Sequence, residues 1–216
     1  MQNVLKHICF DLDGTLVDSH KTIYNSTIKS LNDLNIPNNI DEQIFREKIG
    51  KHFVDIFDDM NIPVSDFEEF IKVYKNNYFL FIDDSKLYPD VSDVLDFLSQ
   101  KGFKISLLTT KAQDQAEKIL EHFNLSKYFD VIMGRRNEIA HKPSPEPLLR
   151  ICNELYVKPN ESLIVGDTEM DILCGQNSNV KTCAVIHGYR TEESILIHKP
   201  DYIVKDLNQL KELFSK

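Results

Sequence analysis

The sequence predicts an α/β protein in which a doubly wound parallel sheet is interrupted by an inserted all-helical domain. Three observations lead to this fold class. An isolated apolar run opens the chain at residues 4–10, residues 22–83 show only helical spacing of apolar side chains, and apolar runs then alternate with amphipathic helical patterns up to residue 214. This alternation favours parallel strands joined right-handedly by helices on both faces, which is a Rossmann-like core.

Length and composition describe an ordinary globular chain. Its 216 residues are 42% hydrophobic and 27% charged, with 7 glycines and 8 prolines, which excludes collagen-like, low-complexity and disordered proteins. The formal net charge of −9 argues against a nucleic acid or an anionic membrane as the main partner, because both attract clustered cations. A local cationic group or a bound metal would still attract a small anion.

Cysteine usage and hydropathy point to the cytoplasm. Cys9, Cys152 and Cys174 lie in apolar runs, and the chain has no CxxC pair or Cys/His cluster, so we expect buried, reduced thiols and no zinc site. The N-terminal segment lacks the pattern of a signal peptide, and no apolar run is long enough to span a membrane. We therefore expect a cytoplasmic protein, and the sequence leaves open whether it is a monomer or a homodimer.

The first strand and the inserted helices follow from local patterns. Residues 4–10 (VLKHICF) are apolar and β-branched enough for a buried strand, which ends abruptly at Asp11. Residues 22–83 then show apolar side chains at helical spacing, with breaks at Pro37 and Pro63. The predicted domains are an α/β core of residues 1–17 and 86–216 and a helical domain of residues 18–85.

The rest of the chain predicts alternating helices and strands. Gly102 ends the first helix, and Ser144 followed by Pro145 has the pattern of an N-cap with proline in the first turn. Strands are expected at residues 103–108, 130–133, 162–165, 181–186 and 202–204. Helices are expected at residues 91–100, 113–123, 145–155, 169–176 and 207–214.

Acidic side chains follow two of the predicted strands, at the edge where open α/β sheets bind ligands. Asp11 and Asp13 stand two residues apart, so in an extended chain their carboxylates would point the same way and need a shared proton or a cation. Asp167 and Asp171 stand four apart and would face one point from the first turn of a helix. Each pair also has a structural interpretation, as an Asp-Gly turn or as helix-capping charges.

Two further features complete the pattern. Thr109 places a hydroxyl at the end of the strand at 103–108, where the amides of a following helix would favour an oxyanion. Lys142 stands among prolines before the next helix. Taken singly, an N-cap threonine and a solvated lysine are the better explanations of these two residues. In combination with the acidic pairs, they would supply a nucleophile, an acid–base group, phosphate donors, a cation and an oxygen-rich site suited to Mg²⁺.

This combination resembles the haloacid dehalogenase-like (HAD) superfamily, and within it the phosphoglycolate phosphatase-like branch that carries a helical cap after the first strand. The resemblance covers essentially the whole chain. It rests on the segments FDLDGTLVDS at 10–19, LTTK at 108–111, KPSP at 142–145 and GDTEMD at 166–171. It implies a Mg²⁺-dependent phosphatase that hydrolyses a small phosphorylated metabolite through an aspartyl-phosphate intermediate.

The resemblance also implies a role for each motif residue. Asp11 would be the nucleophile, and Asp13 would protonate the leaving group and then activate water. The groups expected to hold the phosphoryl oxygens are Thr109, Lys142 and the main-chain amides of Leu12 and Thr110. The expected metal ligands are Asp11, Asp13 through its main-chain carbonyl, Asp167 and Asp171.

The helical cap is expected to set substrate choice. Its segment IGKH at 49–52 resembles the specificity loop of the branch, so Lys51 and His52 are candidate substrate-binding residues, with Arg46 a weaker one. Solvated helix charges are an equally good explanation of these side chains.

The four motifs leave several activities open. A pyrophosphatase, a nucleotidase and a sugar phosphomutase of the same family share them, and so would a catalytically silent protein that binds metal or phosphate. The second aspartate, Asp13, argues against a dehalogenase. No cap lysine stands out as the Schiff-base residue that a phosphonate hydrolase would need.

Overall fold

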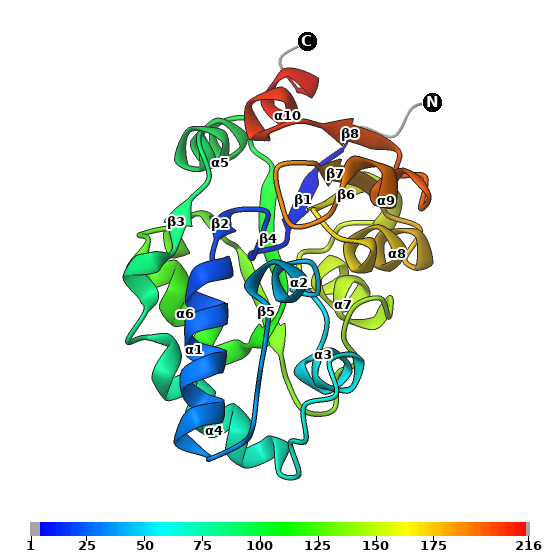
Figure 1. Cartoon of the computed structure of the whole chain (residues 1–216). Coiled ribbons are helices and arrows are strands. Elements are labelled where there is room, and N and C mark those ends of the chain that lie inside the picture. Colours follow the sequence, from blue (N-terminus) through cyan, green and yellow to red (C-terminus); the bar gives the residue numbers. More distant parts are fainter. Residues whose placement is uncertain (1–4, 215–216) are drawn as a thin grey trace.

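The computed structural model describes residues 5–214, in which a six-stranded parallel sheet has helices on both faces (Figure 1). The strand order in space is β5-β4-β1-β6-β7-β8, and every neighbouring pair is parallel. The first strand of the sequence is therefore central, and the connections run first to one side of it and then to the other. The predicted fold class is confirmed; residue 4 of the predicted first strand lies outside the described residues.

The core elements follow the sequence patterns closely. The strands are β1 (His7–Phe10), β4 (Lys104–Ala112), β5 (Val131–Arg135), β6 (Ser162–Gly166), β7 (Lys181–Val185) and β8 (Tyr202–Val204). The helices are α5 (Val91–Gln100), α6 (Gln113–His122), α7 (Glu146–Glu154), α8 (Glu169–Asn177), α9 (Glu192–Leu196) and α10 (Leu207–Leu213), with single turns η2 (Ser126–Tyr128) and η3 (Pro159–Glu161). The five-residue α9 was not predicted, because so short a helix shows no clear periodicity.

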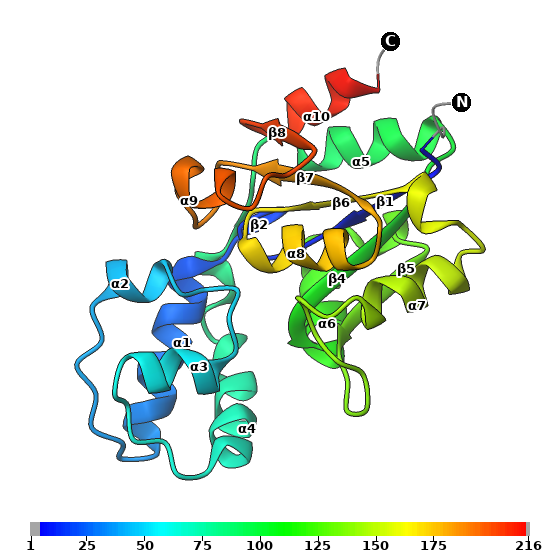
Figure 2. The ribbon, with the colours of Figure 1, turned by 90° about the vertical axis from the view of Figure 1, so that its right-hand side faces the viewer.

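Alternation of side chains along β1 produces two apolar layers, one on each face of the sheet. Ile8 and Phe10 belong to the layer that includes α5, α6 and α10, whereas Cys9 belongs to the layer under α7 and α8. Figure 2 shows α5 and α10 on one side of the sheet and α7 and α8 on the other. All four cysteines are buried free thiols, as expected, and burial raises the pKa of Cys174 and of Cys183 to about 12.

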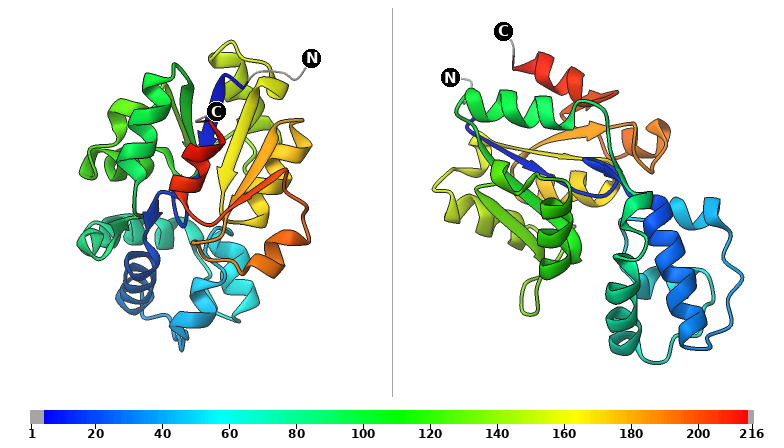
Figure 3. Two further views of the ribbon diagram at one scale, coloured as in Figure 1. Left: turned by 90° about the horizontal axis from the view of Figure 1, so that it is seen from above. Right: turned by 90° about the vertical axis from the view of Figure 1, so that its left-hand side faces the viewer.

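A separate group of helices lies beyond the carboxyl ends of the strands (Figures 2 and 3). It contains α1 (His20–Asp33), α2 (Glu42–Arg46), α3 (Phe53–Asp59), α4 (Phe67–Tyr78) and the single turn η1 (Ile82–Asp84), all within the segment assigned to the cap. Aromatic side chains fill its interior: the Phe70 ring centroid lies 4.9 Å from that of Phe57 and 5.1 Å from that of Phe53. An antiparallel pair of short strands, β2 (Val17–Asp18) and β3 (Lys86–Leu87), joins this cap to the core.

The structure corrects one expectation about β4. The strand does not stop at residue 108 but continues to Ala112, where it pairs with Arg135 of β5 after a register irregularity. Thr109 and Thr110 therefore lie within an extended segment and not at a helix N-terminus. The extra strand residues reach to the cap side of the sheet. None of the helices in residues 5–214 has the length and apolar character that crossing a bilayer requires.

Candidate active site

The site lies at the carboxyl end of the central strand β1. The main-chain N–H of Asp11 donates to the carbonyl of Val165 over 2.9 Å, which holds Asp11 beside the end of β6. Strand β6 ends at Gly166, and Asp167 follows directly. Because β1 lies between β4 and β6, the residues that follow these strands meet at one edge of the sheet.

Three buried aspartates form a cluster at this edge. Carboxylate oxygens of Asp11, Asp167 and Asp171 all lie within 4.8 Å of one another. Asp171 enters the cluster from the first turn of α8. The side chains of Asp167 and Asp171 approach each other, as expected, and both lie beside Asp11. Asp11 thus lies beside two aspartates that follow it by 156 and 160 positions in the chain.

A buried lysine joins two of these carboxylates. The Nζ atom of Lys142 lies 2.6 Å from Oδ1 of Asp11 and 2.6 Å from Oδ1 of Asp171. Only 3% of this residue is exposed, so it is not the solvated lysine that the sequence left open. The other carboxylate oxygen of Asp11, Oδ2, makes no hydrogen bond within residues 5–214 and remains available for chemistry.

Burial controls the protonation of the cluster. Burial raises the pKa of Asp11 well above its usual value; Lys142 opposes this shift, and Asp171 and Asp167 add to it. Burial and the charge of Asp171 raise the pKa of Asp167 to about 7. Burial alone would lower the pKa of Lys142, but the carboxylates of Asp11 and Asp171 raise it. Three carboxylates against one ammonium group leave two excess negative charges in the ionised cluster, which a divalent cation would neutralise.

The donor chemistry of the cluster fits a hard cation. Its ligand atoms are carboxylate oxygens, which suit Mg²⁺ or another oxygen-preferring divalent ion, and no thiolate or imidazole takes part in it. The cluster therefore supports a metal site, in which the three aspartates are the residues able to hold the ion.

Asp167 is fixed in place by its surroundings. Its Oδ1 accepts a hydrogen bond from the hydroxyl of Thr15 over 3.2 Å, and its Oδ2 accepts one from the main-chain N–H of Tyr189 over 2.8 Å. Gly14 and Gly188 both approach this carboxylate so closely that a Cβ on either would lie 2.3 Å from one of its oxygens. Glycine is needed at these two positions because the backbone itself borders the carboxylate.

Asp171 is fixed by a capping box at the start of α8. Its Oδ2 accepts from the main-chain N–H of Thr168 over 3.1 Å and from the Thr168 hydroxyl over 2.7 Å. The N-cap of α8 is thus Thr168, and the alternative interpretation of Asp167 as the cap is wrong. Asp167 stays outside the helix and free to face Asp11.

Asp13 has different surroundings from Asp11. Its carboxylate accepts a hydrogen bond from the Ser19 hydroxyl and lies 3.3 Å from Nζ of Lys111, and it is not part of the cluster of aspartates. The expectation that Asp11 and Asp13 would point the same way assumed an extended chain, but β1 ends at Phe10 and the chain bends at residue 12, between the two aspartates. The side chain of Asp13 faces the cap instead.

The residues expected to hold phosphoryl oxygens lie around this edge. Thr109 is buried in β4, and its hydroxyl accepts from the main-chain N–H of Lys111 over 3.3 Å. Thr110 lines the cavity between core and cap together with Asp13. The side chain of Leu12 is buried in the apolar core, which leaves only its main chain for the site.

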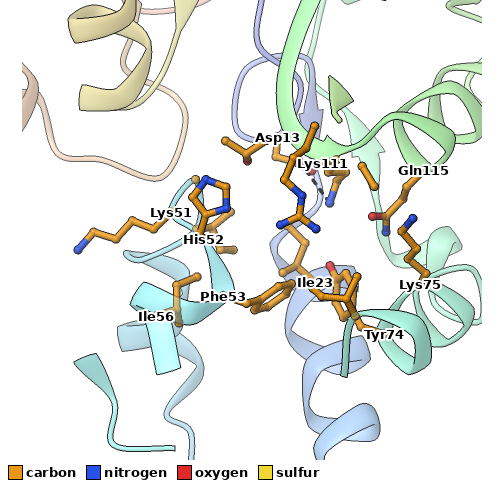
Figure 4. Close-up of a pocket in the computed structure, with 16 residues that line it drawn as sticks. Asp13, Ile23, Lys51, His52, Phe53, Ile56, Tyr74, Lys75, Lys111 and Gln115 are labelled. Atoms are coloured by element: carbon orange, nitrogen blue, oxygen red, sulfur yellow. Dashed lines mark ion pairs between the residues drawn. The ribbon is translucent and has the colours of Figure 1, made fainter. Parts of the chain in front are cut away.

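A cavity of about 70 Å³ lies between this edge and the cap (Figure 4). His52 lines it, and its ring contacts that of His141 of the core in a tilted arrangement, with 3.7 Å between the centroids and 60° between the ring planes. Lys51 also borders the cavity, but its ammonium group lies 3.2 Å from a carboxylate oxygen of Asp59, and Figure 4 shows its side chain pointing away from Asp13. Arg46 donates to the carbonyl of Gly188 and so links cap and core.

Comparison with known proteins agrees with this geometry. Residues 8–185 match the family described as haloacid dehalogenase-like hydrolase. The chain belongs to this family. A putative pyrophosphatase PpaX from Clostridium perfringens is 34% identical over 99% of both chains. A phosphoglycolate phosphatase from Aquifex aeolicus is 34% identical over 98% of this chain and 97% of that protein. A solved haloacid dehalogenase-like hydrolase from Streptococcus pneumoniae has a TM-score of 0.87, with 25% identity over 98% of this chain and 99% of that one.

Three residues of this hydrolase contact the site or the cap in ways that the sequence patterns did not specify. Lys111 pairs with Asp13, the main-chain N–H of Tyr189 holds Asp167, and Arg190 joins the core to the cap. Arg190 donates to the carbonyls of Glu47 and Ile49 and pairs with Glu169 over 2.7 Å. The signals available in the sequence were the lysine inside LTTK and the polar segment HGYR after a strand, but neither specifies a partner.

Proposed function

We propose that this hydrolase is a Mg²⁺-dependent phosphatase that hydrolyses a small phosphate monoester resembling phosphoglycolate. The observation that carries the proposal is the junction of Asp11, Lys142 and Asp167: a carboxylate with one available oxygen, an ammonium group that neutralises part of its charge, and a second carboxylate able to share a metal. The relative named phosphoglycolate phosphatase supports this substrate. The partner is a small phosphorylated metabolite in the cytoplasm and not a nucleic acid or a membrane.

In the first half of the proposed reaction, Oδ2 of Asp11 attacks phosphorus to form an aspartyl-phosphate. The bond between phosphorus and the ester oxygen breaks, and the electron pair leaves on that oxygen. Asp13 gives the leaving oxygen a proton, which makes a neutral alcohol. Lys142 keeps the Asp11 carboxylate oriented through its hydrogen bond to Oδ1.

In the second half, Asp13 takes a proton from water, and the water oxygen attacks phosphorus. The bond between phosphorus and Asp11 breaks, which releases phosphate and restores both carboxyl groups to their starting states. Thr109 and the main-chain amides of Leu12 and Thr110 hold the phosphoryl oxygens in both steps. Closure of the cap over the cavity would keep other water out.

Mg²⁺ would be held by Asp11, Asp167 and Asp171, together with the carbonyl of Asp13 that the family resemblance implies. When bound, it offsets the repulsion between an anionic nucleophile and an anionic phosphoryl group. We expect Mg²⁺ to raise the melting temperature of the wild-type protein, with a gain of about 2.7 kcal/mol at a hundred times its dissociation constant. Asp167→Asn should lose most of this gain; a variant that responds to Mg²⁺ as the wild type does would contradict the assignment.

The direct test of the proposed function is phosphate release from a panel of phosphorylated metabolites with Mg²⁺. Asp11→Asn should lower kcat by at least about 10³-fold, because the amide is a poor nucleophile, while the fold stays intact by circular dichroism. Asp58→Asn, the same exchange at an exposed position of α3, is the matched control and should keep wild-type activity. Near-normal turnover by Asp11→Asn would remove it as the nucleophile.

A pyrophosphatase is the second candidate function. It is favoured by the relatives named PpaX, one of which, a pyrophosphatase from Halalkalibacterium halodurans, is 31% identical over 95% of this chain. The same mechanism applies, with phosphate in place of the alcohol as the leaving group. Ranking phosphoglycolate, pyrophosphate, nucleoside monophosphates and sugar phosphates by kcat/KM decides between these phosphatases. Return of the phosphoryl group to a sugar without free phosphate would indicate a mutase.

A further inference from the structure

One arginine at the edge of the cap–core cavity has no hydrogen-bond or ion-pair partner in the described part of the chain. Arg135 ends β5, where it pairs in register with Ala112 of β4, and it lines the cavity with Asp13 and Thr110. Within residues 5–214, its guanidinium group forms no hydrogen bond or ion pair. The other arginines each donate to a protein oxygen; they are Arg46, Arg136, Arg150 and Arg190. Arg135 is therefore a charged donor without an acceptor.

A second unsatisfied donor lines the same cavity. Gln115 of α6 is only 4% exposed, and its Nε2 is buried without a hydrogen-bond partner. In Figure 4 its amide lies on the side of the pocket opposite His52. A buried amide donor without an acceptor is costly, and a bound ligand that accepts from it removes that cost.

The remaining positive charges around the cavity are already neutralised. Lys111 pairs with Asp13, Lys75 lies 2.7 Å from a carboxylate oxygen of Asp114, and Lys51 pairs with Asp59. Burial, together with the charges of His141 and Arg135, lowers the pKa of His52 to about 4, so this ring is neutral at physiological pH.

A second pocket that Arg135 also borders does not supply a countercharge for its guanidinium group either. Asp55 and Arg135 both border it, but no ion pair joins them. Among the described residues that line the cap–core cavity, Arg135 therefore carries the one positive charge without a protein countercharge.

We propose that Arg135 and Gln115 bind a second anionic group of the substrate. This assignment rests on the proposed phosphatase function and narrows its substrate class to phosphate esters or anhydrides that also carry a carboxylate or a second phosphate. A guanidinium group binds either anion through paired N–H donors, and the amide of Gln115 adds a third. The apolar side chains of Phe53, Ile71 and Tyr74 in the same cavity strengthen such a contact because they exclude water.

The test compares substrates that differ in the second group. 2-Phosphoglycolate carries a carboxylate, pyrophosphate carries a second phosphate, and ethyl phosphate carries neither. Arg135→Gln should lower kcat/KM for the preferred substrate with a second anionic group about 10- to 100-fold and change kcat/KM for ethyl phosphate by less than about 2-fold. A selective loss on phosphoglycolate identifies a carboxylate, and a selective loss on pyrophosphate identifies a phosphate. Equal losses on all three substrates, or no loss on any, would overturn the proposal.

Matched variants separate charge from general disruption. Arg135→Lys should recover part of the loss, because it keeps the positive charge without the paired donors. Gln115→Met should lower kcat/KM for the substrate with the second anionic group, relative to kcat/KM for ethyl phosphate, about 3- to 10-fold, since one neutral donor is removed. Arg136→Gln, at the neighbouring residue, is the control. The Nε of Arg136 already donates to Gln113 over 3.1 Å, so this variant should leave the relative kcat/KM of the two kinds of substrate unaltered.

A binding measurement keeps this inference distinct from the proposed function. If the wild type releases no phosphate from any of the three compounds, the phosphatase proposal fails on its own. Calorimetric titration with phosphonoacetate and ethylphosphonate, neither of which has a hydrolysable ester bond, then still tests Arg135. At least tenfold tighter binding of phosphonoacetate, lost in Arg135→Gln, supports the second anion site, and equal binding of the two compounds overturns it.

Discussion

Asp11 and Asp13 are two residues apart and each lies beside a lysine, but only Asp11 also has two carboxylates as neighbours. Asp11 shares a buried cluster with two other carboxylates and one lysine, and Asp13 lies between the Ser19 hydroxyl and the Lys111 ammonium group. Pairs of carboxyl groups with different surroundings are how one site provides both a nucleophile and a proton donor. The turn after β1 produces this difference, because it directs one side chain into the sheet edge and the other towards the cap.

Replacing Asp13 by asparagine tests its proton-transfer role. Asp13→Asn keeps the shape and still accepts from Ser19, but it cannot exchange a proton, so kcat for an alkyl phosphate should fall about 10²- to 10⁴-fold. Stopped-flow or steady-state phosphate release measures the effect. Asp93→Asn, at an exposed position of α5, is the control. A loss smaller than about 10-fold would assign the proton transfers to another group.

At the level of elements, the contact between cap and core depends on Arg190. This residue follows β7 and binds the loop between α2 and α3 through the carbonyls of Glu47 and Ile49, at 2.6 Å and 3.0 Å. Its other nitrogens pair with Glu169 at the start of α8, which also carries Asp171. One side chain therefore couples the cap loop to the helix that positions a site carboxylate.

Arg190→Met should loosen this contact. Charge-assisted hydrogen bonds of this kind contribute about 1.5–3 kcal/mol each, so opening of the loop should become roughly 10-fold more frequent or more. Hydrogen exchange of residues 47–52 should accelerate accordingly, and KM should rise more than kcat falls. Arg150→Met, which removes an exposed pair with Glu146, provides the comparison. Unchanged exchange in the loop would show that the cap is held by other contacts.

At the level of the whole molecule, the centre of the sheet contains a buried histidine. His7 of β1 contacts the hydroxyl of Ser162 in β6 over 3.0 Å and that of Ser106 in β4 over 2.8 Å. Burial lowers its pKa to about 4, although the charge of Asp130 partly opposes the shift. The folded protein therefore keeps this ring neutral at pH values where the unfolded chain protonates it.

This difference predicts a pH dependence of stability. Between pH 6.5 and pH 4 the unfolded chain binds a proton at His7 that the folded protein does not bind, so the free energy of unfolding should fall as the pH falls, by about 1.4 kcal/mol per pH unit. Above pH 6.5 the ring is neutral in both states and contributes no slope. Urea titrations of wild type and His7→Asn should differ in slope only in that window. His122→Asn, at a partly exposed position, should retain the wild-type slope.

The sequence could predict what local patterns encode. Strand and helix positions in the core followed from apolar periodicity. Asp11, Asp167 and Asp171 were selected because acidic side chains follow two predicted strands, and the topology brings the ends of these strands together. Lys142 was selected from its place among prolines before a helix. The short strands β2 and β3 were missed because two residues show no period.

By itself, the sequence determined the fold class and which side chains carry the chemistry, because these depend on residue type, spacing and the meeting of strand ends. Only the tertiary structure decided the directions of the side chains. It separated Asp13 from the aspartate cluster, turned Lys51 towards Asp59, buried Lys142 between two carboxylates and left Arg135 without a partner. Each outcome depends on contacts between segments far apart in the chain, which the spacing of residues along it does not specify.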